Sequence, residues 1–270
     1  MAITAAQVNE LRQRTGLGMM ECKKALQEND GDVDKAIEYF RKKGVKTSVT
    51  GREAGEGRVA AFVNADRTRG VLVEVKCNTD FTARNEVVAE VLKLAGETLL
   101  ANPSASPAED SRITEKLVAV SQQTGENVQL GRSQVVEGAK VGKFEYTVTN
   151  KVAALVAADS ASVPDEVLTD IGLHVVAVKP VTIGLSRQDV PEDLVSAERE
   201  IAVEQAKATG KPQEIAEKIA EGKMSAFYRE RVLAEQEFIN PDKFKGTVAD
   251  YAKKSGGTLT GFARLEVGVA

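Results

Sequence analysis

The residues best suited to chemistry or recognition lie in one short stretch, Asn78-Thr79-Asp80-Phe81-Thr82. It sets an aromatic ring beside a carboxylate and two hydroxyls, a combination that can anchor a protein to a partner and hold a polar contact there. Two interpretations of Phe81 remain open. It is either an exposed anchor on a loop or a side chain that folds back on the next helix as a hydrophobic staple.

The stretch is expected to join a strand to a helix. Before it, apolar residues alternate with polar ones, as in a strand with one buried face, at Val71, Val73, Val75 and Cys77. After it, apolar residues recur every three or four positions, as on one face of a helix, at Val87, Val88, Val91, Leu92, Ala95 and Leu99. Phe81 is therefore expected in the connection.

Length and composition set the class of protein. The 270 residues leave room for two or three domains, and 42% hydrophobic with 28% charged residues is typical of a globular protein. No apolar run is long enough to span a bilayer, and the first residues show no signal-peptide pattern, so we expect a cytoplasmic protein without a membrane partner. The net charge of -4 argues against direct binding of nucleic acid.

The sequence predicts no enzyme, no catalytic residue, no metal site and no cofactor. The two cysteines, Cys22 and Cys77, fall on apolar faces of separate segments, which favours buried thiols in a reducing compartment. Together with the single histidine, His174, they make no metal-ligand spacing. His174 lies in an apolar helix, where a buried histidine bonded to backbone is a better interpretation than a catalytic one. No Gly-Lys-Ser or Gly-Lys-Thr phosphate loop occurs.

Residues 1–44 are predicted to form a three-helix bundle. Thr4 with Gln7 forms a capping box for the first helix, and Asp32 caps the third. Met19 and Met20 are adjacent, so they cannot both face one core, and at least one is expected to be exposed; packing of both at a helix end is the alternative. Residues 45–56 are glycine-containing and aperiodic, which indicates a linker.

An α+β core with an internal repeat is predicted to follow. Residues 57–140 and 141–190 each give strand, hairpin, strand and helix, which suggests two copies packed side by side, and residues 239–270 add a helix and a closing strand to the second copy. In the second hairpin Phe144, Tyr146 and Val148 alternate with polar residues and predict one buried face. This copy lacks the Asp-Phe anchor.

Residues 191–238 are predicted to form a projecting helical hairpin, a coiled-coil arm. Leu194, Ile201 and Ala208 keep a seven-residue spacing, and Ile215 and Ile219 would line the returning helix. Most of the other residues are charged, so the arm is expected to be thin and solvated.

Four motifs resemble the elongation factor Ts family, the guanine nucleotide exchange factors of elongation factor Tu. They are residues 78–83 (Asn-Thr-Asp-Phe-Thr-Ala), the stretch from Glu10 to Leu26, residues 209–218 around Gly-Lys-Pro, and residues 260–268 near the end. Their order matches the family over nearly the whole chain. Two departures are Thr209, where the family often has serine, and Asp170, where some members have a histidine.

The resemblance implies a translation factor that binds elongation factor Tu and promotes release of GDP by disturbing the partner's magnesium site. It implies insertion of Phe81, with Asp80 holding the loop or a partner donor and with Thr79 and Thr82 shaping the turn. It also implies that the bundle is of the ubiquitin-associated type and docks through Arg12, Met19 and Met20. Whether the protein forms a homodimer or a heterotetramer with its partner, and what the arm contacts, is left open.

The alternative is a non-catalytic adaptor that binds ubiquitin-like or ribosomal proteins through the amino-terminal bundle. Such an adaptor explains the first 43 residues but leaves the Asp80-Phe81 loop without a role.

Overall fold

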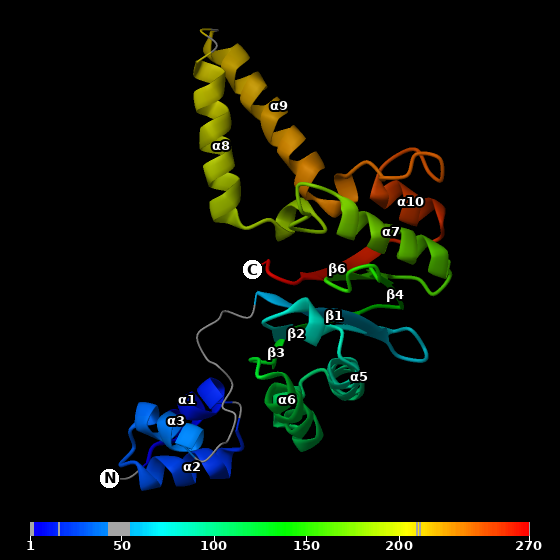
Figure 1. Ribbon diagram of the computed structural model, residues 1–270. Helices are drawn as coiled ribbons and strands as arrows, with labels where there is room; N and C mark the ends of the chain where they lie inside the picture. Colours follow the sequence, from blue (N-terminus) through cyan, green and yellow to red (C-terminus); the bar gives the residue numbers. More distant parts are fainter. Residues whose placement is uncertain (1–2, 16, 43–54, 209, 211, 270) are drawn as a thin grey trace.

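The structure of the chain is a computed structural model that describes residues 3–15, 17–42, 55–208, 210 and 212–269. Mixed helices and strands confirm the predicted α+β class (Figure 1). In the described part, two antiparallel sheets have the strand orders β1-β2-β3 and β4-β5-β6. The strands are β1 Glu56–Val63, β2 Arg69–Cys77, β3 Gln129–Glu137, β4 Lys140–Glu145, β5 Val152–Ala158 and β6 Leu259–Glu266.

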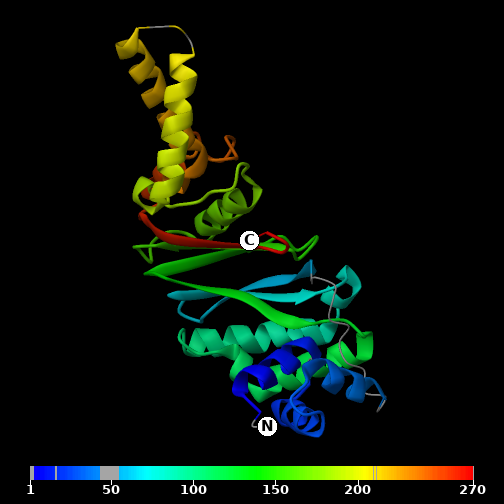
Figure 2. The ribbon, with the colours of Figure 1, turned by 90° about the vertical axis from the view of Figure 1, so that its left-hand side faces the viewer.

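The two sheets are stacked face to face, which corrects the expectation that the copies lie side by side (Figure 2). Leu72 of β2 and Leu155 of β5 are both fully buried in one apolar cluster between the sheets. As predicted, β6 closes the second sheet by pairing with β5 across more than a hundred residues of sequence, with Val152 opposite Glu266.

Because of this stacking, β2 is buried on both faces, and the prediction of a single buried face is wrong. Val71, Val73 and Val75 face the helices as expected. On the opposite face, Leu72 packs against the second sheet, and Glu74, which pairs with Arg132 of β3, is 0% exposed. Alternation of polar and apolar residues failed here because Glu74 is a buried, paired carboxylate.

Helices cover the two outer faces, so the core has four layers (Figure 1). The first sheet is covered by α5 Glu86–Ala101 and α6 Ser111–Thr124, and the second by α7 Asp165–Ala177 and α10 Val248–Lys254. Short 3-10 turns lie at η1 Pro107–Glu109, η2 Arg187–Asp189 and η3 Leu233–Glu235. β1 already includes Glu56, and β4 already includes Lys140.

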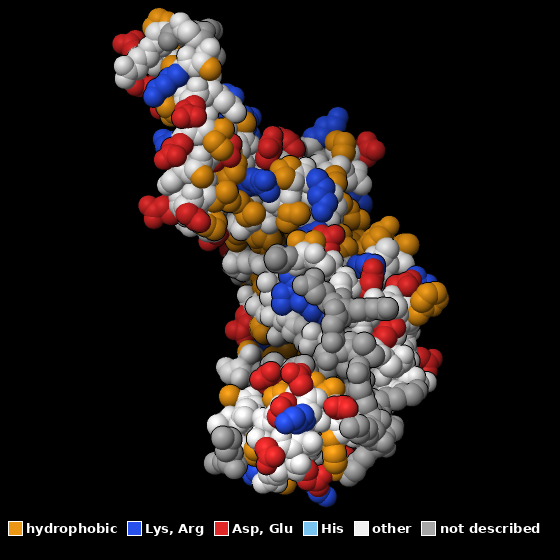
Figure 3. Space-filling model, turned by 60° about the vertical axis from the view of Figure 1, so that its left-hand side comes forward, with side chains coloured by type: hydrophobic (Ala, Val, Ile, Leu, Met, Phe, Trp, Pro, Cys, Tyr) orange, Lys and Arg blue, Asp and Glu red, His pale blue; other side chains and the backbone are white. Residues whose placement is uncertain are grey.

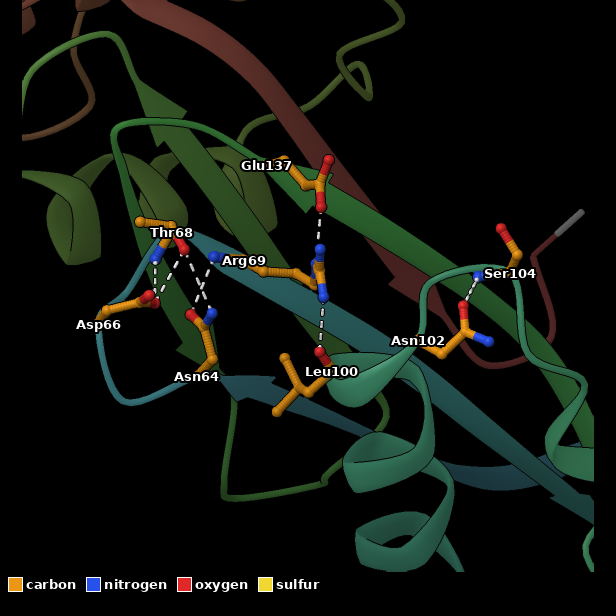
Figure 4. Close-up of polar contacts among 8 residues, drawn as sticks. All are labelled: Asn64, Asp66, Thr68, Arg69, Leu100, Asn102, Ser104 and Glu137. Atoms are coloured by element: carbon orange, nitrogen blue, oxygen red, sulfur yellow. Dashed lines mark hydrogen bonds and ion pairs between the residues drawn. The ribbon is translucent and has the colours of Figure 1, made fainter.

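The β1-β2 turn is held by its own side chains (Figure 4). Asp66 Oδ1 accepts hydrogen bonds from the backbone N–H and the hydroxyl of Thr68 at 3.2 and 2.8 Å. Arg69 then donates to Glu137 of β3 at 2.6 Å and to the carbonyl of Leu100 at the end of α5 at 2.7 Å. This one side chain thus fastens the end of α5 to the sheet that positions the functional loop.

The second hairpin departs from its prediction. β4 ends at Glu145, and the chain turns back through a bond from the Asn150 N–H to the Tyr146 carbonyl, with Asn150 at a φ of 54°. Tyr146 and Val148 therefore lie in an exposed turn and do not line a buried face. Asparagine tolerates the left-handed conformation that the turn requires, and this overrides the local alternation.

The amino-terminal bundle consists of α1 Ala5–Thr15, α2 Met19–Glu28 and α3 Val33–Lys42, packed around its own apolar cluster. The predicted caps are confirmed. Thr4 Oγ1 accepts from the Gln7 N–H and the Gln7 side chain accepts from the Thr4 N–H, while Asp32 Oδ1 accepts from two N–H groups of the first turn of α3. Gly44 and most of the predicted linker lie outside the described residues.

The arm is a pair of helices, α8 Glu192–Lys207 and α9 Gln213–Arg231, that projects from the core on the side of α7 (Figure 1). Its predicted seam is wrong in part, since Leu194, Ile201 and Ile215 are exposed. The helices meet instead through small residues and a few larger ones: Ala202, Ala206, Ala216, Ala220 and Met224, flanked by Val195, Val203 and Ile219. Alanine allows close helix approach, and charged side chains of both signs lie among apolar ones on the face of the arm seen in Figure 3.

This seam makes a testable prediction. Ala206→Leu adds volume where the helices touch and should destabilise the arm by about 1 to 3 kcal/mol, whereas Ile201→Ala, at an exposed position, should change stability by less than about 0.5 kcal/mol. Circular dichroism of both variants during urea unfolding measures the difference. Equal losses would mean that the heptad pattern of the sequence, and not the alanine seam, holds the helices together.

His174 of α7 is fully buried, as predicted, and it is bonded to one side chain as well as to one backbone group. Its Nδ1 accepts from the Ile239 N–H at 3.1 Å, so Nε2 carries the proton and donates to Gln236 Oε1 at 2.9 Å. Burial lowers the pKa of His174 below its usual value, and the bond to Gln236 offsets this only in part. The ring is a neutral structural group.

We expect this histidine to make stability depend on pH. The unfolded chain takes up a proton near pH 6.5, while the folded ring, with its lowered pKa, does not; stability is therefore fully present above about pH 6.5 and falls as the pH falls below it. NMR titration of the chain's only imidazole should give a midpoint below pH 6.5 in the folded protein. A midpoint at the ordinary value would contradict the burial argument.

Candidate partner-binding site

The loop between β2 and α5 forms a single helical turn, α4 Asp80–Ala83. Thr79 caps it, because its Oγ1 accepts from the Thr82 N–H at 3.3 Å. Thr82 and Ala83 point inward and are buried, and this leaves Phe81 on the outer side of the turn. The ring of Phe81 is 82% exposed, so it does not act as a staple on α5.

A carboxylate from a distant part of the chain holds this turn. Glu126 lies just after α6, and one of its oxygens accepts from the N–H groups of Asn78 and Thr79 at 3.1 and 3.0 Å. The other accepts from the Thr79 hydroxyl at 2.6 Å. Asn78 reciprocates, since its Oδ1 accepts from the Asn127 N–H at 2.9 Å. The start of the loop is thereby fixed before Phe81 is reached.

The remaining polar groups of Thr79 are also satisfied. The buried thiol of Cys77 donates to the Thr79 carbonyl at 3.1 Å. Burial raises the pKa of Cys77 to about 11, with Glu126 adding to the effect, so the group is a protonated donor and not a nucleophile. Both cysteines are free and buried, as the sequence predicts.

Asp80 faces a shallow hollow of about 220 Å³ beside the exposed loop. It pairs with Arg84 one turn later at 3.1 Å, and both groups stay open to solvent. The far side of the hollow is formed by the turn of the second copy, including Val148 and Lys151. The face that presents Phe81 is thus continuous with the exposed turn of the other sheet.

The corresponding loop of the second copy is used internally. Asp159 accepts from the Thr258 N–H at 2.6 Å and donates its own N–H back to the Thr258 carbonyl at 2.9 Å. Asp170 is likewise occupied: it accepts from Lys243 at 2.8 Å and from the Tyr251 hydroxyl at 3.0 Å. These residues stabilise the second half of the core, and of the two corresponding loops it is the one in the first copy that carries an exposed aromatic ring, Phe81.

The predicted docking residues lie on the separate bundle. Met19 and Met20 are both exposed, at 53% and 75%, at the start of α2, and Arg12 of α1 is half-buried. The packing alternative for the methionines is therefore excluded. The bundle and the Phe81 turn form two distinct exposed apolar surfaces.

Sequence reasoning missed Glu126 as part of the site. It stands more than forty residues after the loop and in no recognisable motif, so only the pairing of β3 with β2 brings it close. Within the described residues, no three His, Cys, Asp or Glu side chains gather as metal ligands. No described helix is both long and apolar enough to cross a membrane.

The site is thus an exposed aromatic ring on a turn whose polar groups are hydrogen-bonded within the chain. Comparison with known proteins identifies the family of this chain. Residues 78–269 match the family model described as Elongation factor TS. The chain is 41% identical to elongation factor Ts of Vibrio vulnificus over 271 residues, and 42% identical to that of Cellvibrio japonicus over 277. These alignments cover 99% of this chain and 92% and 91% of the relatives.

The chain therefore belongs to the elongation factor Ts family, and its class is that of the translation elongation factors.

Proposed function

We propose that this protein binds elongation factor Tu in its GDP-bound state and accelerates the release of GDP. The observation that carries the proposal is the 82% exposed ring of Phe81 on a turn whose polar groups are satisfied. An exposed Phe side chain adds no hydrophobic stabilisation to the folded chain, whereas its burial contributes about 1.5 to 3 kcal/mol. Binding recovers this energy.

The mechanism is one of linkage. An exchange protein that prefers the nucleotide-free partner weakens the partner's affinity for nucleotide, and bound nucleotide weakens the affinity for the exchange protein by the same ratio. Incoming GTP therefore dissociates the complex. In such a GTPase, magnesium bridges the nucleotide phosphates and the protein. A ring that displaces side chains near the metal removes part of this attraction without touching the nucleotide.

The residues divide into two roles. Phe81 is the wedge, Asp80 holds the turn through Arg84 or exchanges this contact for a partner donor, and Thr79 and Thr82 shape the turn. Met19, Met20 and Arg12 dock the bundle on the partner, where adaptable methionine side chains suit a surface contact. Separate modules for docking and for displacement let affinity and release rate change independently.

In this proposal the protein acts in the cytoplasm as a non-enzymatic exchange factor, with no cofactor and no direct contact with nucleic acid or membrane. It chemically alters neither the nucleotide nor the partner. An adaptor acting through Met19 and Met20 alone would bind partners but would not need Phe81.

The test is stopped-flow release of fluorescent GDP from elongation factor Tu with and without this protein. Acceleration that saturates with increasing factor supports exchange activity. Binding without acceleration would support the adaptor, and no acceleration at saturation would contradict the proposal.

A further inference from the structure

We infer that Glu126 is a positioning residue for exchange: it holds the Asn78-Thr79 backbone so that Phe81 is presented outward in a fixed orientation. The inference rests on the proposed function for its consequence, but its geometry stands in the free protein. Glu126 touches neither nucleotide nor metal in this account, and it acts only through the loop.

Hydrogen bonds join the turn after α6, at Glu126 and Asn127, to the start of the Phe81 loop, at Asn78 and Thr79; we call this set of bonds the clamp. Glu126 accepts three hydrogen bonds from Asn78 and Thr79, at 2.6 to 3.1 Å, and Asn127 returns one to Asn78. The backbone of Glu126 is itself held, since its N–H donates at 3.2 Å to Oγ1 of Thr124, the last residue of α6, and Gly125 between them is the C-cap. The clamp therefore rests on the same layer that supports the sheet.

A carboxylate suits this position because all three partners are donors. An ionised carboxylate only accepts hydrogen bonds and offers about four acceptor positions, so two N–H groups and a hydroxyl can be satisfied together. A glutamine has one acceptor oxygen and no charge. With that oxygen on the two N–H groups, its N–H₂ group faces the Thr79 hydroxyl, which can then no longer donate to residue 126. Glu126→Gln is thus nearly equal in size, removes the hydroxyl-to-carboxylate bond and leaves only a neutral acceptor for the two N–H groups.

The effect on Phe81 follows from the cap. Thr79 Oγ1 donates to Glu126 while it accepts from the Thr82 N–H, so the same hydroxyl closes α4 and is oriented by the clamp. Thr82 and Ala83 are the inward residues of this turn. If the Thr79 cap is lost, α4 frays and the Phe81 side chain samples many orientations. Fixing one orientation during exchange then costs conformational entropy, which opposes GDP release.

The first measurement is the maximal rate of GDP release at saturating factor. Because hydrogen bonds to charged groups are stronger than neutral ones, we expect Glu126→Gln to lower this rate about tenfold. The factor concentration at half-saturation should stay within about twofold, since docking through Met19 and Met20 is untouched. Glu115→Gln is the matched control: it removes the same charge from an exposed position on α6 and should leave both quantities unchanged.

A double-mutant cycle with Phe81→Ala separates positioning from a general structural role. If Glu126 acts through the ring, Glu126→Gln should slow release by less than about twofold when Phe81 is already alanine, because coupled residues are not additive. A full tenfold loss in that background would overturn the inference.

Amide hydrogen exchange tests the clamp without the partner. In the wild-type protein the N–H groups of Asn78 and Thr79 should be protected, and in Glu126→Gln they should exchange at least about tenfold faster. Equal exchange in the two proteins would overturn the inference, as would a wild-type release rate in a variant that has lost the protection. If the wild-type protein fails to accelerate GDP release, the proposed function fails, and this measurement still decides whether the clamp exists.

Discussion

Phe81→Ala is expected to slow GDP release from elongation factor Tu about a hundredfold at saturating factor, as truncation of a central aromatic anchor does at interfaces. The free energy of unfolding of the Phe81→Ala variant should differ from wild type by less than about 0.5 kcal/mol, because the ring is exposed in the free protein. Stopped-flow kinetics gives the first quantity and urea unfolding the second.

The matched control for stability is Phe238→Ala. Phe238 is buried in the core of the second sheet, and its truncation should cost about 3 to 5 kcal/mol without a specific effect on the maximal rate of release. A Phe81→Ala protein that lost several kcal/mol and kept normal exchange would identify Phe81 as a packing residue.

The largest expected effect on stability comes from Arg132. Its guanidinium donates to both oxygens of the buried Glu74 at 2.9 and 3.0 Å, while its backbone N–H donates to the same carboxylate at 3.1 Å. The guanidinium also donates to the Glu266 carbonyl at 2.7 Å and to the carbonyl of Val269, which follows β6. Arg132→Met leaves a buried carboxylate without its partner, which should cost about 3 to 5 kcal/mol in the free energy of unfolding. Guanidinium denaturation at pH 7.5 measures this loss.

The pH dependence of that loss identifies its cause. Burial alone would raise the pKa of Glu74, but the hydrogen bonds from Arg132 outweigh it and hold the pKa below its ordinary value. Without Arg132, Glu74 can lose its buried charge by taking up a proton. The loss in the free energy of unfolding caused by Arg132→Met should therefore shrink as the pH is lowered from about 7.5 to 5.

Two controls test the same argument. The double variant with Glu74→Met should be more stable than Arg132→Met alone, because no buried charge remains. Arg112→Met breaks an exposed pair with Asp110 and should cost less than about 1 kcal/mol. A loss of that small size for Arg132→Met would contradict the buried-charge account.

Much of the fold was predictable because local signals and tertiary packing agree. The Thr4-Gln7 capping box, the β5 strand and the closing strand β6 lie where the sequence places them. Each rests on chemistry within a few residues: a hydroxyl facing an N–H, or apolar residues at a fixed period.

Predictions failed where a distant part of the chain decided the outcome. Leu72 and Glu74 are buried because a second sheet lies across them, and no local pattern contains that sheet. In the arm, Ile201 fits a heptad but the helices approach through alanines, which periodicity of large apolar residues does not reveal.

The site shows the same division. The Thr-Asp-Phe motif marked the loop, and the exposure of Phe81, Met19 and Met20 agrees with one of the two interpretations that the sequence left open. The role of Glu126 could not be predicted from the sequence. It depends on the register between β2 and β3, which contains an irregularity and is set by the whole sheet.

The central claim is that the exposed Phe81 ring releases GDP by disturbing the magnesium site, and one stopped-flow comparison tests it most directly. GDP release from elongation factor Tu is measured at saturating wild-type or Phe81→Ala protein, with magnesium present and after its chelation. The account predicts a difference of about a hundredfold with magnesium and convergence of the two rates without it, because the metal on which the ring acts is then gone. Equal rates with magnesium, or a hundredfold difference that persists after chelation, would contradict it.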